Sequence, residues 1–474
     1  MKDLTEKTLQ TITPEMVPEE ARDILQKLNE AGYEAFIVGG CVRDCLLGKK
    51  PADWDITTSA RPEEVKAVFT HTVDTGLQHG TVTVLQRTDG KLTGYEVTTY
   101  RIDGEYEDAR HPKEVTFTAE LAEDLKRRDF TINAMAYHPE AGLKDLFHGR
   151  EDLENGVIRC VGEAKERFTE DALRMMRAIR FAAQLDAEIE PATWEAIKAL
   201  APNIAKVSAE RIRVEMEKLL VSDHPDRFRL FYESGLTTYF LPEWDATMTT
   251  TQENPHHCYN VGEHILHALV STDLDGLKQE DLPGGFERNR RILRLTMLFH
   301  DIAKPLMKTM DEDGICHFHG HPEKGAEMTE EILKRFKYDN DTVHMVSGLV
   351  RTHEGRFDAT RRLLRRAINR YGEEQFPLYF YMQEADVLGQ SSFLREEKLE
   401  RIAQLRELYK EIRALNEAVS LKDLAVKGAD LIKAGVQPGP QMGELLHQML
   451  EDVLEEPEHN EKEYLLEKYV SRKG

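Results

Sequence analysis

Two aspartates near the start of the chain stand where they could hold a metal ion. Asp53 and Asp55 belong to the segment ADWDITTSA, whose composition predicts a β-strand. Residues two apart on a strand point to the same face, so these carboxylates would repel each other unless a proton or a cation lay between them. Mg²⁺ suits such a pair, because it prefers oxygen ligands and keeps water and phosphate in its shell.

A glycine pair and an arginine precede the aspartates. Gly39 and Gly40 end a predicted buried strand and open a short helix, and Arg43 follows within that helix. Backbone N–H groups at such a turn can approach an anion, and Arg43 adds a side-chain donor. Metal and phosphate recognition this close together indicates phosphoryl or nucleotidyl transfer. The alternative is an ordinary turn followed by a solvated strand edge.

A second pattern of acids and arginines lies in a helix predicted over 170–181. Glu170, Asp171, Arg174 and Arg177 fall within one arc of this helix, and the opposite side is apolar. A carboxylate accepts from an exocyclic amino group and a guanidinium donates to a ring nitrogen, so Asp171 and Arg174 could accept cytosine and adenine and reject uracil and guanine. The alternative is a solvated face of ion pairs.

Histidines and aspartates recur between about residues 254 and 390. His300 and Asp301 end the apolar run LRLTMLF, where an ionisable pair needs a partner. Imidazole and carboxylate together suit a transition metal such as Mn²⁺, Ni²⁺, Co²⁺ or Fe. The other members of this pattern are His264, His319, His321, His353 and Asp386.

The elements that must position these residues change in type along the chain. Strands are expected at 33–40, 81–86 and 95–101, with a turn at 88–90, and helical patterns dominate from residue 151 onward. This order predicts an α+β fold, in which a small mixed α/β head is followed by an all-α remainder. We expect four parts, namely 1–150, 151–245, 246–400 and 401–474.

Composition narrows the cellular setting. The 474 residues carry a net charge of −23, which taken alone argues against a nucleic-acid partner, but KRRD at 126–129 and the five arginines of 361–370 form basic islands. No apolar run approaches the roughly 18 residues of a membrane span, so no membrane partner is expected. The polar N-terminus does not resemble a signal peptide, and the five scattered cysteines favour a cytoplasmic protein with reduced thiols. The oligomeric state stays open.

The motifs VGGCVRD and DWDITT resemble the nucleotidyltransferases of the DNA polymerase beta superfamily, in the branch of bacterial tRNA nucleotidyltransferases (CCA-adding enzymes) and poly(A) polymerases. Further segments are similar in the same order: RRDFTINAMAY at 127–137, a hinge-like segment at 144–162, ERFTEDALRMMRAIRFAAQL at 166–185 and VSAERIRVEMEKLL at 207–220. The resemblance implies a head, a helical neck and body, and a tRNA-binding tail.

The resemblance also implies roles for single residues. Asp53 and Asp55 would hold Mg²⁺, with Glu96 as a third catalytic acid, and Arg128 and Asp129 would read the ribose. The nucleotide-binding set would comprise Gly39, Gly40, Arg43, Arg128, Asp129, Asn133, Asp171, Arg174, Arg177 and Arg180. The expected reaction is template-independent addition of CCA to the acceptor end of tRNA from CTP and ATP, with release of pyrophosphate. The segment 101–117 resembles the flexible loop that accompanies addition of A.

Alternatives within the superfamily are a poly(A) polymerase and an enzyme that adds only A. A basic-aromatic, GRRF-like signature of the poly(A) branch is not found in the sequence. For binding RNA, the arginines of 361–370 and the Gly-Pro-Gly turn of the tail could contact phosphates, although a solvated helix would also explain the arginines.

The histidine pattern resembles the HD superfamily of metal-dependent phosphohydrolases. His264, His300, Asp301 and Asp386 match its minimal ligand set, and His321 and His353 match its optional additions. A complete set implies hydrolysis of a terminal phosphate in repair of RNA 3′ ends, and the alternative is a degenerate domain kept for binding tRNA. An interpretation of another class is an HD phosphohydrolase whose nucleotidyltransferase-like half only binds RNA. A scaffold without catalysis would need neither constellation.

Overall fold

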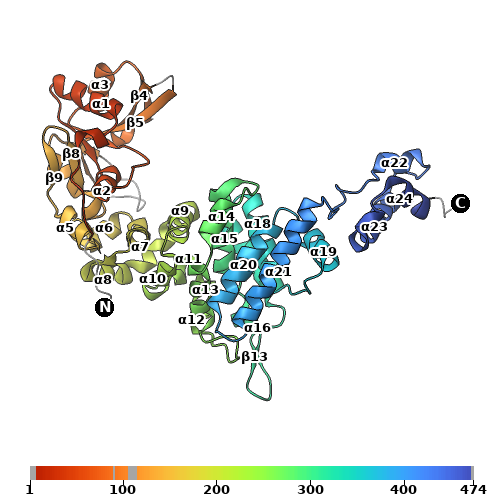
Figure 1. Cartoon of the computed structure of the whole chain (residues 1–474). Helices are drawn as coiled ribbons and strands as arrows, with labels where there is room; N and C mark the ends of the chain where they lie inside the picture. The colour runs from red at the N-terminus through yellow and green to blue at the C-terminus, as the bar shows by residue number, and fades with distance from the viewer. Residues whose placement is uncertain (1–6, 89–90, 105–114, 471–474) are drawn as a thin grey trace. The chain divides into compact units, whose positions relative to one another are not determined.

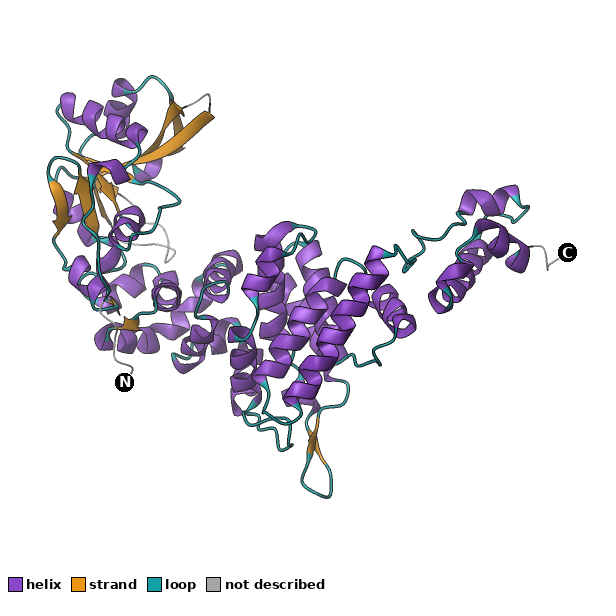
Figure 2. Ribbon diagram, viewed as in Figure 1, coloured by secondary structure: helices purple, strands orange, loops and turns teal. Residues whose placement is uncertain are grey.

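The computed structural model describes residues 7–88, 91–104 and 115–470, and the chain divides into two compact units, Met1–Pro242 and Glu243–Gly474. Strands gather in the first unit, and the second is almost entirely helical (Figures 1 and 2). The predicted α+β fold is confirmed. The boundary at residue 242 lies close to the expected division at 245, and the finer division into four parts stays a prediction.

A seven-stranded mixed sheet forms the centre of the head. Its order is β3-β4-β5-β2-β1-β8-β9, in which β2 and β5 are parallel and every other neighbouring pair is antiparallel. The strands are β1 Ala35–Val38, β2 Ile56–Thr58, β3 Thr72–Gly76, β4 Thr81–Thr88, β5 Lys91–Thr99, β8 Met135–His138 and β9 Gly142–Asp145. A separate pair joins β6 Arg101–Asp103 to β7 Val115–Phe117.

The strand expected over 52–60 is shorter than predicted. β2 begins at Ile56, so Asp53 and Asp55 precede the strand and do not lie on one of its faces. The main chain explains the change: Val38 N–H still donates to the carbonyl of Asp55 at 3.0 Å, but the antiparallel register with β1 ends there. Both aspartates are exposed at the strand entrance, where water can solvate two like charges.

Helices cover the head and build the neck. The expected helix after the glycine pair is α2 Gly40–Leu46, followed by Gly48 in a left-handed conformation. The remaining α-helices among the described residues of this unit are α1 Glu19–Glu30, α3 Pro62–Val68, α4 Leu121–Lys126, α5 Gly149–Glu154, α6 Ala164–Glu170, α7 Leu173–Leu185, α8 Pro191–Leu200, α9 Ala209–Leu220, α10 Arg229–Glu233 and α11 Thr237–Phe240. A short parallel pair joins β10 Val157–Ile158 to β11 Glu188–Ile189.

The helix predicted over 170–181 is broken. α6 ends at Glu170, Asp171 has extended backbone angles (φ −140°, ψ 104°), and α7 begins at Leu173. The Asp171 carboxylate accepts the N–H of Leu173 at 3.0 Å, so this side chain bonds to the first residue of the new helix and Asp171 does not continue the old one. The apolar side expected beyond the break is confirmed, since Ala172, Met176 and Ile179 are fully buried.

The second unit is a helical body followed by a smaller cluster at the C-terminal end. The body comprises α12 Pro242–Thr249, α13 Val261–Val270, α14 Leu274–Gln279, α15 Gly285–Phe299, α16 Lys304–Met307, α17 His321–Arg335, α18 Asn340–Thr352, α19 Arg361–Tyr371, α20 Phe376–Gly389 and α21 Arg395–Ala414, with one hairpin of β12 Thr309–Met310 and β13 Cys316–His317. The end of the chain has its own apolar core under α22 Gly428–Lys433, α23 Pro440–Glu455 and α24 Lys462–Tyr469. Among the described residues, no helix combines the length and apolar character needed to cross a lipid bilayer.

The five arginines of 361–370 lie on α19, and four of them (Arg361, Arg362, Arg365 and Arg366) bind acidic residues of the same unit. Arg362 pairs with Glu455 at 2.7 Å, and Arg365 pairs with Glu417 at 2.7 Å and donates to the carbonyls of Leu454 and Glu455. Arg361 and Arg366 also have carboxylate partners. These pairs connect α19 to the C-terminal cluster, which favours the alternative that the basic helix has a structural role.

Candidate functional site

Three carboxylates lie at one end of the head sheet. Asp55 directly precedes Ile56 and Glu96 directly precedes Val97, and these strand residues are partners in the parallel register of β2 and β5. Asp55 and Glu96 therefore stand at the same level of neighbouring strands, and both are exposed. Although the Asp55 side chain reaches solvent, partial loss of its hydration shell and the nearby charge of Asp53 raise the pKa of Asp55 against the opposing effect of Arg128. Exposed carboxylate oxygens that repel one another fit Mg²⁺.

Gly39 allows a close approach beside this cluster. Its φ is +85°, and a Cβ at this position would lie 3.0 Å from Arg128 Nη1 and 4.0 Å from Asp55 Oδ2. An L-residue would therefore be strained in its backbone and would press on the Arg128 guanidinium. The turn brings its backbone, Arg128 and Asp55 together, as phosphate recognition beside a metal requires.

A chain of hydrogen bonds runs from the head into the neck. Arg43 Nη1 donates to Asn133 Oδ1 at 2.7 Å, Asn133 Nδ2 donates to Asp129 Oδ1 at 3.2 Å, and Arg177 Nε donates to Asp129 Oδ2 at 2.7 Å. Burial acts to raise the pKa of Asp129, but the charges of Arg177 and Arg174 outweigh it and lower that pKa to about 2. Asp129 is therefore a fixed anion in the centre of the predicted nucleotide-binding set.

The predicted base-reading pair is held by other residues of the first unit. Asp171 Oδ2 accepts from Arg211 at 2.7 Å, whereas Arg174 donates to Glu170 at 2.6 Å and to the carbonyl of Arg127 at 3.2 Å. The segment 127–129 thus contacts both clusters, because Arg128 lies beside Gly39 and Asp55 while its neighbours bond to the α7 arginines. The segment 127–129 therefore connects the carboxylates of the head with the predicted base-reading pair.

Two residues of α9 that the sequence reasoning did not single out complete this arrangement. Glu215 is buried, pairs with Arg180 and lies 3.8 Å from Arg177, and Arg211 holds Asp171 as described. Arg180 in turn stacks on the ring of Phe181 with 3.8 Å between guanidinium and ring centre. The signal was present in the sequence: Glu215 falls on the same helix face as Ile212, Met216 and Leu219, where an acid requires a buried cation.

The histidine constellation forms one cluster of two ligand groups in the helical body. In one group, His264 Nε2 lies 3.1 Å from His300 Nε2 and 3.0 Å from Asp386 Oδ1. In the other group, His321 Nε2 lies 3.0 Å from His353 Nε2, and Asp301 Oδ1 lies 3.2 Å and 3.4 Å from these two nitrogens.

Asp301 stands between the two groups. Its other oxygen, Oδ2, faces His264 at 3.4 Å and His300 at 3.5 Å. Lys304 Nζ is 2.7 Å from the same oxygen, yet neither Asp301 oxygen accepts a hydrogen bond of good geometry, although both are buried. A carboxylate with one oxygen toward each group can bridge two cations.

All four histidines present the same nitrogen to the centre. The Nδ1 atoms of His264, His300, His321 and His353 lie 3.1, 2.8, 2.8 and 2.7 Å from backbone carbonyl oxygens. Only an N–H can face a carbonyl oxygen, so each ring donates through Nδ1 and directs the Nε2 lone pair inward. This arrangement is typical of metal ligands. Six predicted ligands therefore converge, and the residues fit two divalent ions.

The cluster forms part of the wall of a cavity of about 470 Å³. Asp301, His353 and Asp386 line it together with cations and aromatic side chains from the surrounding helices. His319, which the sequence pattern also includes, lines the same cavity and is not part of either ligand group. The loop expected at 101–117 lies mostly outside the described residues.

Three family models match: "Poly A polymerase head domain" over residues 35–159, "Probable RNA and SrmB- binding site of polymerase A" over 186–248, and a second domain of tRNA nucleotidyltransferases over 317–469. The CCA-adding enzyme of Limosilactobacillus reuteri is 38% identical over 455 residues, which cover 95% of this chain and 96% of that protein. The one from Leuconostoc mesenteroides is 46% identical over 280 residues, covering 58% of this chain and 68% of that protein.

Solved structures are similar over nearly the whole length. The Bacillus stearothermophilus CCA-adding enzyme in complex with CTP superposes with a TM-score of 0.69 at 30% identity, covering 98% of this chain and 99% of that one. The Thermotoga maritima CCA-adding enzyme complexed with tRNA gives a TM-score of 0.57 at 20% identity, covering 98% of this chain and all of that one, which supports the shared fold.

Proposed function

This chain belongs to the family of CCA-adding enzymes, and from that membership we propose that it adds C, C and A to the 3′ end of tRNA in the cytoplasm, using CTP and ATP. The observation that carries the proposal is the junction at 127–129, which contacts both the carboxylate cluster and the α7 arginines. A site that must join a nucleotide to an RNA end needs these two functions side by side.

Asp53, Asp55 and Glu96 would hold Mg²⁺ at the end of the sheet. When bound, the ions supply charge neutralisation and activation of the attacking 3′-hydroxyl. The chain's own residues orient the nucleotide: the Gly39–Gly40 turn with Arg43 faces the triphosphate, and Arg128 and Asp129 face the ribose. Arg177 and Arg180, fixed by Asp129 and Glu215, provide positive charge along the phosphates.

Base selection rests on Asp171 and Arg174. The carboxylate accepts an exocyclic amino group and the guanidinium donates to a ring nitrogen, which matches cytosine and adenine. Uracil and guanine would leave acceptors unpaired at about 1–3 kcal/mol per group. Glu170 binds Arg174 at 2.6 Å and Arg211 binds Asp171 at 2.7 Å, so the base must displace or share these hydrogen bonds. Both side chains are already fixed in one orientation, so base binding costs no further side-chain entropy.

The test is incubation of tRNA lacking its terminal CCA with Mg²⁺ and each nucleotide separately, followed by sequencing of the 3′ end. Addition of C from CTP and then of A from ATP supports the proposal. Addition of A alone identifies an A-adding enzyme, and long runs of A identify the alternative poly(A) polymerase. The variant D53N/D55N should lose all addition, and addition at the normal rate would contradict the assigned carboxylates.

We propose a second activity, a metal-dependent phosphohydrolase in the helical body. The observation that favours it is the convergence of four inward-facing Nε2 atoms with Asp301 and Asp386, three of these six residues (Asp301, His353 and Asp386) lining one cavity. Two transition divalent ions (Mn²⁺, Ni²⁺, Co²⁺ or Fe) would be held by His264, His300 and Asp386 and by His321 and His353, with Asp301 between them. Bound ions supply a water of lowered pKa and Lewis-acid stabilisation.

The proposed substrate is an RNA whose 3′ hydroxyl is blocked by a terminal phosphate. Hydrolysis of this phosphate would free the 3′ hydroxyl for nucleotide addition. Metal analysis of the full chain should give two ions, and phosphate release should need them. The variant H300A/D301A should lose phosphate release and keep nucleotide addition. Retention of phosphate release in that variant removes the hydrolase proposal, and loss of cellular function only in this variant would favour a hydrolase whose other half binds RNA.

A further inference from the structure

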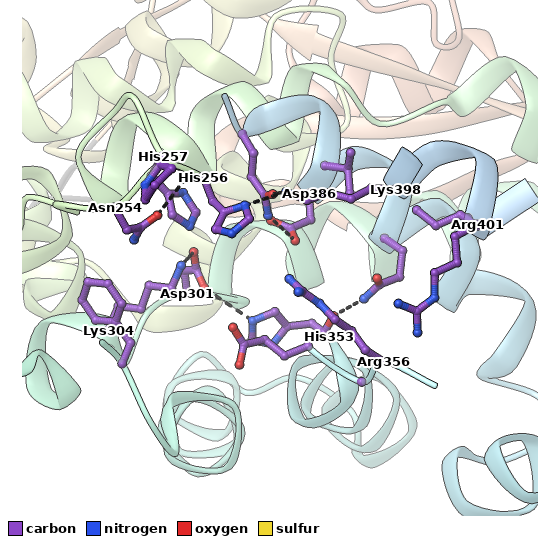
Figure 3. A pocket seen from close by; sticks show the side chains of 18 of the residues that line it. Asn254, His256, His257, Asp301, Lys304, His353, Arg356, Asp386, Lys398 and Arg401 are labelled. Carbon is purple, nitrogen blue, oxygen red and sulfur yellow. Dashed lines mark hydrogen bonds and ion pairs between the residues drawn. The ribbon is translucent and has the colours of Figure 1, made fainter. Parts of the chain in front are cut away.

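The cavity over the histidine cluster has a basic wall that the proposed hydrolysis does not explain. This basic wall consists of Arg356, which follows α18, and Lys398 and Arg401 on α21. All three line the same cavity as Asp301, His353 and Asp386, and Figure 3 shows Lys398 and Arg401 on the α21 side of it.

The charges of the basic wall have no acidic partner among the described residues. Lys398 Nζ donates to Gln390 Oε1 at 2.7 Å and lies 3.1 Å from His256 Nδ1, which are neutral groups. Arg401 donates to the backbone carbonyl of Phe357, and Arg356 has no hydrogen bond or ion pair with the described residues. The α19 arginines of the same unit, by contrast, are paired with glutamates.

Arg356 and Lys398 are also close enough to oppose each other. Burial lowers the pKa of Lys398 and the positive charge of Arg356 lowers it further, against the opposing effect of the Asp386 carboxylate. In a chain of net charge −23, three unpaired cations at one cavity raise the local potential and attract an anion. The metal ligands do not need them, because cations beside two divalent ions make binding of those ions less favourable.

The space next to the basic wall suits a nucleoside. Phe357, Tyr379, Ile402 and Leu405 line it, and the rings of Phe357 and Tyr379 stack with 6.1 Å between centroids. An aromatic and aliphatic surface accepts a base or ribose, and the cations on its border accept a phosphate attached to that nucleoside. The phosphate that is removed would bind the metal ions, so the basic wall is left free to bind another phosphate.

We propose that the basic wall binds a second phosphate, so that the site takes nucleotides carrying a phosphate in addition to the one removed. The inference rests on the proposed hydrolase for its scissile phosphate. The second phosphate could be the internucleotide phosphate of a 3′-phosphorylated RNA end or the 5′-phosphate of a free nucleoside 3′,5′-bisphosphate. Both sources share the same chemistry.

Binding of analogues that cannot be hydrolysed tests the basic wall independently of turnover. The probes are adenosine 3′-methylenephosphonate with and without a 5′-phosphate, titrated calorimetrically into the full chain with Mn²⁺. The variant H300A/D301A, which keeps the head unchanged, gives the background of the nucleotidyltransferase site. We expect the 5′-phosphate to tighten binding by at least about tenfold, the value of one charge-assisted hydrogen bond. Equal binding of the two analogues overturns the inference.

Substitution identifies the residues responsible. In K398Q/R401Q, which keeps polar side chains, the gain from the 5′-phosphate should fall below about twofold while the analogue without it binds as before. Lys410 lies on the same helix but does not line the cavity, so K410Q should retain the full gain. A full gain in K398Q/R401Q, with an unchanged unfolding midpoint, also overturns the inference.

Kinetics separates this inference from the hydrolase itself. Phosphate release is compared for adenosine 3′-monophosphate, adenosine 3′,5′-bisphosphate and a 3′-phosphorylated dinucleotide. Higher kcat/KM for either of the last two supports the basic wall, and their order identifies the source. Equal kcat/KM for all three keeps the hydrolase and overturns the inference. Absence of release, with tight binding that depends on Lys398 and Arg401, removes the hydrolase and supports the anion site.

Discussion

Asp129 is held in a network of hydrogen bonds and is also the residue that we propose to contact the ribose. It is buried, accepts from Asn133 and is bonded twice to Arg177, and its pKa is lowered to about 2. A carboxyl group whose folded pKa is depressed contributes stability that is complete above its unfolded pKa of about 3.9 and is lost as the pH falls toward the folded value.

The variant D129N should therefore be less stable at pH 7 by about 2 kcal/mol, because Arg177 loses its anion. Urea unfolding midpoints at pH 7, 4 and 3 measure this. The difference from wild type should be constant down to pH 4 and shrink at pH 3. Asp223 is exposed, and D223N serves as the control that should change the midpoint little at any pH. A difference that grows below pH 4 would contradict the assigned pKa shift.

His321 tests whether the two ligand groups hold separate ions. Its Nε2 atom contacts His353 and Asp301, which belong to the second ligand group, whereas His264, His300 and Asp386 form the first group. The variant H321A should bind one Mn²⁺ per chain where the wild type binds two, as measured by elemental analysis after desalting. His344 is exposed on α18, and H344A should keep two. Two ions in H321A would exclude His321 as a ligand.

The break between α6 and α7 shows how an element can depend on one carboxylate. A continuous helix would place Asp171 on a solvated face, but in the break before α7 its carboxylate bonds to the N–H of Leu173 and to Arg211 of α9, the latter at 2.7 Å. The sequence predicts the helical content and the buried side of α7. It does not reveal the break, because Glu-Asp-Ala-Leu has no glycine or proline and the partner Arg211 is 40 residues away.

Arg211 should matter for nucleotide selection because it orients Asp171. In R211A we expect kcat/KM for CTP and ATP to fall about tenfold, the effect of one lost charge-assisted bond, and discrimination against UTP and GTP to decrease. Steady-state kinetics with all four nucleotides measure both. K218A removes an exposed charge from the same helix and should leave the kinetics unchanged. Equal loss for all four nucleotides in R211A would indicate a general structural defect.

The α19 helix allows buried and exposed arginines to be compared on one element. Arg365 is buried and bonds to Glu417 and to two carbonyls near the end of α23, whereas Arg362 pairs with Glu455 at the surface. Removing one partner of a buried pair costs about 3 kcal/mol or more, and an exposed pair contributes about 0–1 kcal/mol.

We therefore expect R365A to lower the unfolding free energy by about 3 kcal/mol and R362A by less than about 1 kcal/mol. Chemical denaturation of the full chain measures both, and 0.5 M salt should reduce the effect of R362A more than that of R365A. If R362A instead weakens tRNA binding strongly without a change in stability, this helix contacts RNA phosphates, as the basic composition alone allows.

At the scale of the whole molecule, the sequence predicts what is local and ordered along the chain. The motif order predicts an α+β head followed by helices, and the histidine pattern predicts the six residues that converge in the second unit. Residues brought together by tertiary packing were harder to find. Glu215 is marked locally as an acid on an apolar helix face, but its partner Arg180 lies on another helix, and the Arg356–Lys398–Arg401 wall combines a loop with α21, so no local pattern predicts either set of contacts.

The two units should respond separately to metal, because each has its own core and its own ligands. In D53N/D55N, which removes the carboxylates of the head, Mn²⁺ binds only the histidine cluster and stabilises the structure that holds it. Hydrogen exchange should then slow in α13, α15, α18 and α20 and stay unchanged in strands β1, β2, β5 and β8. The same experiment in D53N/D55N/H300A/D301A, which removes a ligand from each group, should show no slowing. Equal slowing of the sheet would mean that the metal site and the nucleotidyltransferase head are coupled, and that hydrolysis and nucleotide addition are regulated together.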